Sequence, residues 1–238
     1  MQSNFKNIRE SEARYHTHLY NQEAVFTGNS WLARPIEKVL SYFDVLLQEK
    51  PENLQILDLG CGVGRHAIPI LEQAKSKNIN AHCTCIDILE SALFHLKKNL
   101  AERNLTKNAS CIQSDIENFI INTDFFDYIL SISCIEHASS RASFEEILEN
   151  IKNGTRKGGI NAFFINCDVV WKEQQSGKEI EPQIELNFSK EELQEIFSKA
   201  YKDWNILETS SKKWLSSQEY LGKKIDFEST CFFFFSQK

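Results

Sequence analysis

The sequence predicts an α/β protein, built as a three-layer αβα sandwich around a mostly parallel, seven-stranded sheet. Segments with helical apolar spacing alternate with short apolar runs from residue 30 onward, which is typical of successive βαβ units. The run at 128–133 is mostly apolar on both faces, as buried parallel strands are. The last two runs, at 205–209 and 227–235, have no helical pattern between them and predict an antiparallel C-terminal hairpin.

The helices and the other strands are predicted from the spacing of apolar residues along the chain. Apolar residues at the spacing i, i+3, i+4, i+7 predict five helices, whose apolar faces begin at Ile36, Ala67, Leu89, Phe144 and Leu193. The other apolar runs predict strands at 54–59, 81–86, 109–112 and 160–166. Ser189 and Glu192 form a capping-box pattern that marks the start of the fifth helix.

Two segments lie outside this alternation. We predict a single domain over residues 1–238, in which residues 1–30 form an N-terminal lid and residues 168–187 form an insertion after the fifth strand that could also act as a lid. The alternatives are a frayed N-terminal helix for the first segment and a solvated loop for the second.

Composition narrows the class of protein. The chain has 238 residues, of which 42% are hydrophobic and 25% charged, which is ordinary for a soluble globular protein. The net charge of −6 argues against binding nucleic acid through its phosphates, so we predict no nucleic-acid partner. No run approaches the roughly 20 apolar residues that span a membrane, and no signal-peptide core is present, which predicts a cytoplasmic protein without a membrane partner. The sequence does not distinguish a monomer from a homodimer.

The seven cysteines show neither a C-x-x-C pair nor zinc-ligand spacing. Several lie inside apolar runs, where a thiol packs as a small hydrophobic group. We therefore predict reduced thiols in a reducing compartment, and no metal site.

The most informative string is ILDLGCGVGRH, residues 56–66, in which an apolar strand leads through three alternating glycines into a helix. Glycine permits positive φ and close approach of a ligand, and the helix start presents unpaired N–H groups. The dinucleotide fingerprint G-x-G-x-x-G places its third glycine one residue later. Asp58, two residues before the first glycine, would repel a pyrophosphate but suit a ligand with positive charge. These features favour S-adenosylmethionine, which carries a sulfonium and an ammonium, over NAD.

Residues 50–165 resemble the class I, Rossmann-like S-adenosylmethionine-dependent methyltransferases, whose first motif is hydrophobic-hydrophobic-Asp-hydrophobic-Gly-x-Gly-x-Gly. The resemblance implies that Asp87 binds the ribose hydroxyls, that Asp115 accepts from the adenine amino group and that the backbone near Ser133 meets the methionine end. The cofactor-binding residues expected from motif and resemblance together are Asp58, Gly60, Cys61, Gly62, Arg65, Asp87, Ile88, Asp115, Ile116 and Ser133.

The acceptor side is expected beyond the fourth strand. Methyl transfer needs alignment of the reactants, and a general base only if the acceptor carries a proton. His137 is the candidate catalytic base, with Glu136 as its orienting partner; a packing or capping role is the alternative. The candidate substrate contacts are Tyr15, Trp31, Arg34 and Trp171.

The sequence therefore predicts a methyltransferase that acts on a small molecule. Its size, the Cys61–Arg65 loop and the Phe-rich last strand resemble the tellurite-resistance methyltransferases, which would imply an oxyanion acceptor of the tellurite or selenite type, attracted by Arg65 or Arg34. The alternatives are a metabolite O- or N-methyltransferase with His137 as base, and a non-catalytic S-adenosylmethionine-binding protein. A macromolecule modifier is disfavoured because the Asn-Pro-Pro-aromatic signature is missing, and an oxidoreductase because of the glycine spacing.

Overall fold

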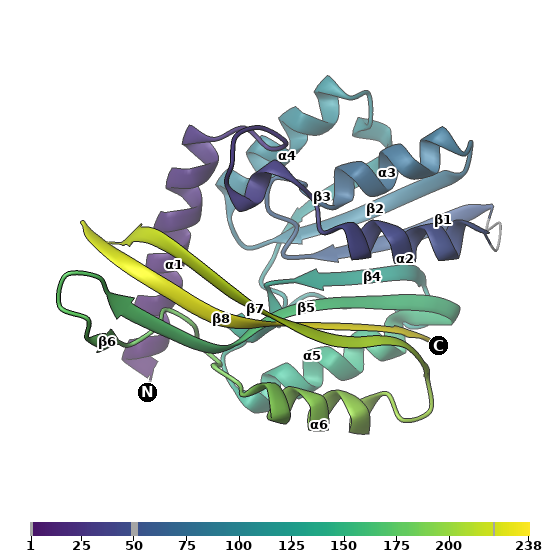
Figure 1. The fold of residues 1–238 in the computed structure, drawn as a ribbon. Helices are drawn as coiled ribbons and strands as arrows, with labels where there is room; N and C mark the ends of the chain where they lie inside the picture. The colour runs from purple at the N-terminus through teal and green to yellow at the C-terminus, as the bar shows by residue number, and fades with distance from the viewer. Residues whose placement is uncertain (1, 49–51, 221) are drawn as a thin grey trace.

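The sheet has a path of seven strands and one short extra strand. The structure is a computed structural model that describes residues 2–48, 52–220 and 222–238. The strand order is β3-β2-β1-β4-β5-β8-β7, and β6 pairs with β5 beside this path (Figure 1). The strands are β1 (Asn53–Leu59), β2 (Asn80–Asp87), β3 (Ala109–Gln113), β4 (Phe126–Ile132), β5 (Thr155–Glu173), β6 (Glu179–Ile180), β7 (Asn205–Tyr220) and β8 (Lys223–Gln237).

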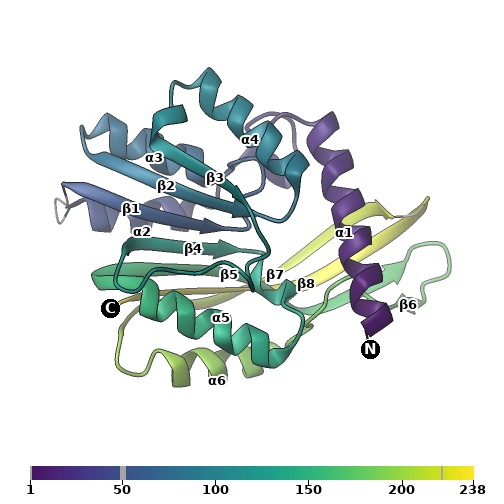
Figure 2. The same cartoon turned by 180° about the vertical axis from the view of Figure 1, so that it is seen from behind.

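The pairing confirms a mostly parallel sheet with an antiparallel C-terminal hairpin. The first five strands of the path pair in parallel, whereas β8 pairs antiparallel with both β5 and β7. Helices cover both faces, which confirms the α/β class (Figures 1 and 2). One face carries α2 (Glu37–Gln48), α3 (Ala67–Ser76) and α4 (Glu90–Glu102), and the other carries α5 (Arg141–Gly154) and α6 (Lys190–Ala200).

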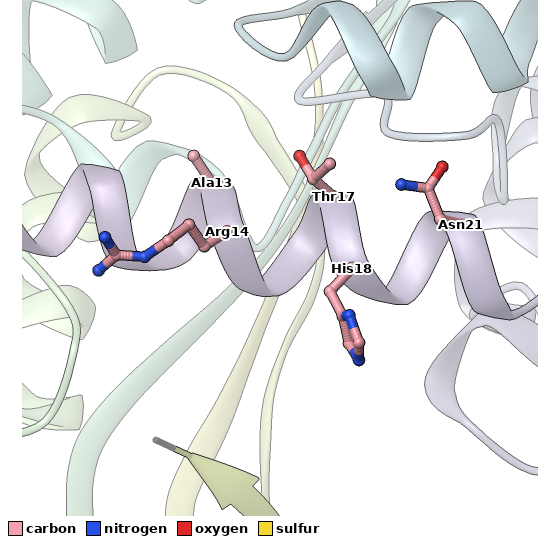
Figure 3. A pocket seen from close by; sticks show the side chains of 5 residues that line it. All are labelled: Ala13, Arg14, Thr17, His18 and Asn21. Atoms are coloured by element: carbon pink, nitrogen blue, oxygen red, sulfur yellow. The ribbon is translucent and has the colours of Figure 1, made fainter. Parts of the chain in front are cut away.

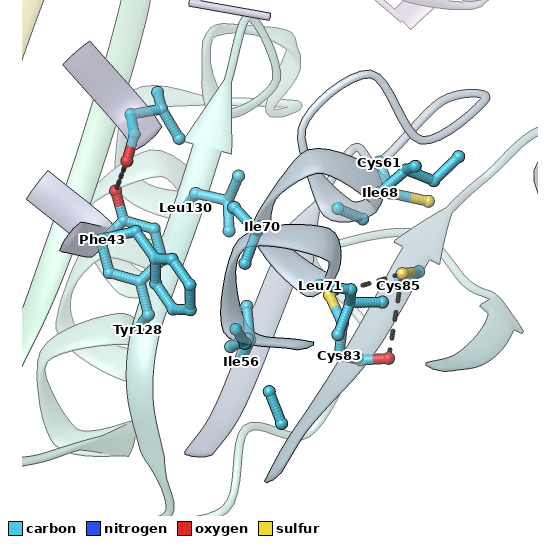
Figure 4. Packing of buried hydrophobic residues seen from close by; sticks show 14 of the residues in the cluster. Phe43, Ile56, Cys61, Ile68, Ile70, Leu71, Cys83, Cys85, Tyr128 and Leu130 are labelled. Carbon is cyan, nitrogen blue, oxygen red and sulfur yellow. Dashed lines mark hydrogen bonds between the residues drawn. The ribbon is translucent and has the colours of Figure 1, made fainter. Parts of the chain in front are cut away.

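The core consists of the apolar helix faces that the spacing predicts. Phe144, Ile147, Leu148 and Ile151 of α5 are all buried against the sheet. On the opposite face, Phe43 of α2 packs on Tyr128 of β4, whose hydroxyl donates to the Val39 carbonyl at 2.8 Å (Figure 4). Each buried side chain of this size contributes about 1.5–3 kcal/mol, so these faces fix the helices on the sheet.

The prediction that β5 ends at residue 166 is wrong, because the strand continues to Glu173. A bulge at Asp168, whose φ is 48°, shifts the register between Cys167 and Val170. Beyond the bulge, Val169 and Trp171 are still buried, and they pack with Ile225 in a cluster of their own. The first third of the expected insertion, 168–173, is therefore strand, and 174–187 forms the connection to α6 and includes β6.

The terminal hairpin is also longer than the sequence indicates: β7 runs to residue 220 and β8 begins at residue 223. The added part of β7 is an edge strand whose side chains are mostly exposed on both faces, so it carries no apolar alternation. The first helix, α1 (Gln2–Gln22), crosses the carboxyl ends of the strands (Figure 2). None of the helices within the described residues is long and apolar enough to cross a membrane.

Candidate active site

The glycine loop joins β1 to α3 and is tied to the end of β2. The N–H groups of Gly60 and Cys61 both donate to the Ile86 carbonyl at 2.9 Å. Gly60 has a φ of 72°, and a Cβ there would lie 2.5 Å from the Cys134 sulfur. Only glycine fits this position, because the loop after β4 packs directly against the backbone. The sequence signal therefore corresponds to a real close approach of two loops.

Asp87 lies against the glycine loop. Its Oδ2 accepts from the Gly62 N–H at 2.8 Å and its Oδ1 from the Leu89 N–H at 2.9 Å. The residue is only 8% exposed, and burial raises the pKa of its carboxyl group although both backbone N–H groups act in the opposite direction. Each carboxylate oxygen keeps a further lone pair, so Asp87 can accept hydrogen bonds from a ligand above the loop.

Asp58 is buried under the same loop with one oxygen unsatisfied. The residue is 2% exposed, and the backbone N–H of Ala67, at the start of α3, donates to its carboxylate. Its Oδ2 has no hydrogen-bond partner among the described residues. Burial raises the pKa of Asp58 well above its usual range. An orphaned carboxylate oxygen beside a glycine cradle suits a ligand that brings a positive charge or an N–H group.

The helix α1 covers the glycine loop, and we call the region between Gly60–Gly62, Asp87 and this helix the crevice. The covering helix presents a polar stripe. Arg9, Glu12, His16 and Tyr20 recur at the spacing of one helix face. The Tyr20 hydroxyl lies 3.0 Å from where a Cβ on Gly62 would stand, and burial raises the pKa of Tyr20 well above its usual range. His16 pairs with Glu12, with 3.4 Å between Nε2 and Oε2, and its buried Nδ1 has no partner among the residues described here.

Arg9 connects α1 to the end of the crevice beyond β3. Its guanidinium forms an ion pair with Asp115, lies 3.4 Å from the Glu117 carboxylate and donates to the His137 carbonyl at 3.3 Å. Asp115 therefore faces the crevice and not bulk solvent, but its carboxylate is already engaged by α1.

His137 lies at the carboxyl end of β4, in the short helix η3 (Ile135–His137). Its Nδ1 bonds Oε2 of Glu185 at 2.6 Å. The expected partner was Glu136, which instead accepts from the Asn166 N–H at 3.0 Å. Burial disfavours the imidazolium, but the hydrogen bond to Glu185 and the carboxylates of Glu136 and Glu12 outweigh it and raise the pKa of His137 to about 9.

Three of the other predicted residues gather at the open end of the loop. Arg65 donates from Nη1 to the Trp31 carbonyl at 2.9 Å, and its guanidinium lies 5.0 Å from the centre of the Trp31 ring. Burial lowers the pKa of Arg65 to about 10, so it remains a cation at neutral pH. Tyr15 stacks edge-on against His16, which itself contacts the Trp31 ring.

The other predicted site residues make no contact with the glycine loop that the structure records among its described residues. Ser133 has a φ of 50° and accepts from the Asn166 side chain at 3.1 Å. Ile88 is exposed and Ile116 is half-buried. Arg34 is exposed and has no ion pair within the described part of the chain. Trp171 is buried against Tyr220 and Ile225, so its ring serves packing in the structure.

Two surface depressions are lined by residues outside the glycine loop. The first is lined only by α1, through Ala13, Arg14, Thr17, His18 and Asn21 (Figure 3). The second lies between α3 and the amino-terminal end of β2. Within the glycine loop, Gly62 is covered by Tyr20 of α1 and Gly60 by Cys134.

Sequence reasoning missed Arg9, Glu12 and Glu185. The helical spacing of Arg9, Glu12, His16 and Tyr20 could have revealed the first two, because polar residues in that pattern predict a helix with a polar inner face. Glu185 carries no such signal, since it lies in an irregular segment and meets His137 across 48 residues.

Known proteins share this arrangement of loop and sheet. Residues 56–159, which span the glycine loop, Asp87, Asp115 and His137, match the family model described as a methyltransferase domain. The matched residues are less than half of the chain, and they include the whole glycine loop.

Two curated methyltransferases are similar over part of the chain. The mitochondrial ubiquinone biosynthesis O-methyltransferase of Dictyostelium discoideum is 32% identical over 104 residues, which are 42% of this chain and 32% of that protein. The tRNA N(3)-methylcytidine methyltransferase of Schizosaccharomyces pombe is 28% identical over 155 residues, 63% of this chain and 48% of that one. The chain thus spans less than half the length of these relatives.

A solved structure shares the methyltransferase fold over nearly the whole chain. TehB from Haemophilus influenzae superposes with a TM-score of 0.60 at 20% identity, covering 94% of this chain and 66% of that chain. At this identity the likeness shows a shared fold alone.

The crevice residues fit S-adenosylmethionine. The Gly60–Gly62 backbone forms a cradle that side chains would fill, and the unpartnered Asp58 oxygen offers an acceptor beside it. Asp87 faces the cradle with lone pairs left for vicinal hydroxyls. Asp115 would meet the adenine only after Arg9 has released it.

Proposed function

We propose that the protein transfers a methyl group from S-adenosylmethionine to a small-molecule acceptor. The observation that carries the proposal is a glycine cradle flanked by the two buried carboxylates of Asp58 and Asp87, one of which has an orphaned oxygen. The cofactor supplies a methyl group on a positively charged sulfur, which favours carboxylates and not cations around it. Gly60, Gly62 and Ser133 would hold its methionine part, and Asp87 its ribose.

Residues 1–30 would act as the lid over this site. Arg9 at one end of α1 engages Asp115, and Tyr20 at the other end lies over Gly62. Cofactor entry therefore requires α1 to move, and its return would exclude water from the reacting groups. The segment 168–187 contributes Glu185 to the same lid, through its contacts with Arg9 and His137.

A small acceptor is supported by the net charge of −6 over the whole chain, because a nucleic-acid substrate is held mainly through its many phosphates. The similarity to a tRNA methyltransferase keeps tRNA as the alternative acceptor. A tellurite- or selenite-type acceptor is the finer proposal, for which the TehB-like fold is a reason to test it.

Titration calorimetry with S-adenosylmethionine, S-adenosylhomocysteine and NAD tests the cofactor assignment. We expect heat with both sulfur nucleosides and none with NAD; the reverse pattern would refute the proposal. An acceptor panel of tellurite, selenite, a catechol, a thiol and unfractionated tRNA, read out as S-adenosylhomocysteine release, tests the acceptor. Turnover of tRNA alone would replace the small-molecule proposal.

A further inference from the structure

Glu185 joins three elements that are distant in the sequence. Its side chain is only 3% exposed, and its two oxygens face different partners. Oε2 bonds His137 Nδ1 at 2.6 Å, and Oε1 lies 3.8 Å from Nε of Arg9 on α1. The Leu186 N–H donates to the Glu136 carbonyl at 3.0 Å, which fixes this segment against η3.

The contact determines which nitrogen of His137 is left for a ligand. Because Nδ1 bonds a carboxylate, Nδ1 must carry a hydrogen, and the ring orientation is fixed. Nε2 has no hydrogen-bond partner among the residues that the structure describes, and the side chain is 32% exposed. Nε2 is therefore the group that an acceptor molecule can reach.

The charges around the ring favour the imidazolium. Glu185 from the β6–α6 connection, Glu136 from η3 and Glu12 from α1 all stabilise it, whereas Arg9 on α1 opposes it. The pKa of about 9 means that Nε2 carries a hydrogen at neutral pH. A protonated Nε2 donates a hydrogen bond and cannot accept a proton.

We propose that Glu185 is a positioning residue that holds His137 as a hydrogen-bond donor toward an acceptor bearing a negatively charged oxygen. This inference rests on the proposed methyltransferase function. The acceptor's own lone pair forms the bond to the methyl carbon, the electron pair of the broken carbon–sulfur bond stays on sulfur, and no proton moves. An anionic acceptor thus needs no general base, and one hydrogen bond to His137 orients it.

The first test is an NMR titration of the His137 ring nitrogens, which does not depend on activity. In the wild-type protein we expect a pKa near 9. In Glu185→Gln it should fall by about two units toward the ordinary value of a histidine. Glu149→Gln, which removes an exposed carboxylate paired with Lys152 on α5, is the matched control and should leave His137 unchanged. A wild-type value at or below about 6.5, or no shift in Glu185→Gln, would overturn the inference.

The second test is the pH profile of selenite and tellurite methylation. The rate ratio of Glu185→Gln to wild type cancels the ionisation of the acceptor itself. If His137 is a donor, this ratio falls as pH rises from 7 to 9, by up to about tenfold per unit. A ratio above one across this pH range, as expected if the variant were the better base, would contradict the proposal. His137→Gln keeps an N–H donor that does not titrate, so it should retain activity with no break near pH 9, whereas His137→Ala should lose it.

The experiments distinguish a failure of the proposed methyltransferase function from a failure of the inference about Glu185 and His137. Absence of S-adenosylmethionine binding would refute the proposed function, while the NMR titration would still report on the Glu185–His137 pair. Binding of the cofactor with turnover of only phenols, amines or tRNA would refute the anionic-acceptor class and leave the methyltransferase function intact.

Discussion

Asp87 has two roles: it stabilises the glycine loop, and it is the proposed partner of the cofactor ribose. Its carboxylate fixes the Gly62 and Leu89 backbone, so it shapes the cradle even before a nucleoside is bound. The same oxygens are the expected partners of the ribose. A substitution there removes a binding contact and loosens the loop, and these two effects must be separated experimentally.

We expect Asp87→Ala to weaken S-adenosylmethionine binding by about 10- to 100-fold, because a pair of charge-assisted hydrogen bonds is lost. Calorimetric titration measures this change, and a melting curve monitors the loop. Asp44→Asn, which alters an exposed carboxylate on α2, is the matched control and should leave affinity unchanged. Unaltered affinity in Asp87→Ala would mean that Asp87 only organises the backbone.

At the scale of elements, α1 is held in part by polar contacts along its length. Arg9 bonds Asp115, Glu117 and the His137 carbonyl, Ser11 bonds Tyr220, and Thr17 bonds Ser91 of α4. Polar contacts of this kind are worth about 1 kcal/mol each and can be exchanged for contacts to water. A helix held in this way can detach from the sheet and dock again while the rest of the protein stays folded.

We expect Arg9→Ala to speed exchange of S-adenosylhomocysteine by roughly tenfold, which corresponds to about 1.4 kcal/mol of lost contacts. Stopped-flow fluorescence of Trp31, which lies beside Tyr20 of α1, can follow the exchange. Lys6→Ala, on the solvent side of the same helix, should exchange at the wild-type rate. Equal rates for Arg9→Ala and wild type would show that α1 does not control access.

The elements differ in how far the sequence predicts them. The helices and parallel strands of 53–166 follow from periodicity, because each buries one apolar face or two. The outer halves of β7 and β8 do not, since an exposed edge strand such as residues 211–217 needs no apolar alternation. The cofactor side of the site is local in sequence and was predicted, whereas Glu185 reaches His137 only through the tertiary fold.

For the whole molecule, two histidines make stability depend on pH in opposite directions. His66 is buried, its Nε2 accepts from the Ile36 N–H at 3.1 Å, and burial together with Arg65 lowers its pKa well below 6.5. The unfolded chain therefore binds a proton that the folded state rejects, so stability falls as pH drops below about 6.5. His137, with its pKa raised to about 9, contributes stability that is present below about 6.5 and is lost as pH rises to 9.

We expect the contribution of His66 to the melting temperature to fall below about pH 6.5, and that of His137 to fall above it. Calorimetry of His137→Gln should show a smaller decline between pH 6.5 and 9 than the wild type, because the glutamine does not titrate. His66→Asn should show a smaller decline on the acid side. If the melting temperatures of His137→Gln and the wild type fell equally above pH 6.5, the raised pKa of His137 would be contradicted.

The Ser11–Tyr220 hydrogen bond spans 209 residues. On the ribosome, α1 is made before the strand that carries Tyr220, so this contact can form only after the terminal hairpin has emerged. The nucleoside cradle, whose parts all lie between β1 and β5, can assemble before that contact forms.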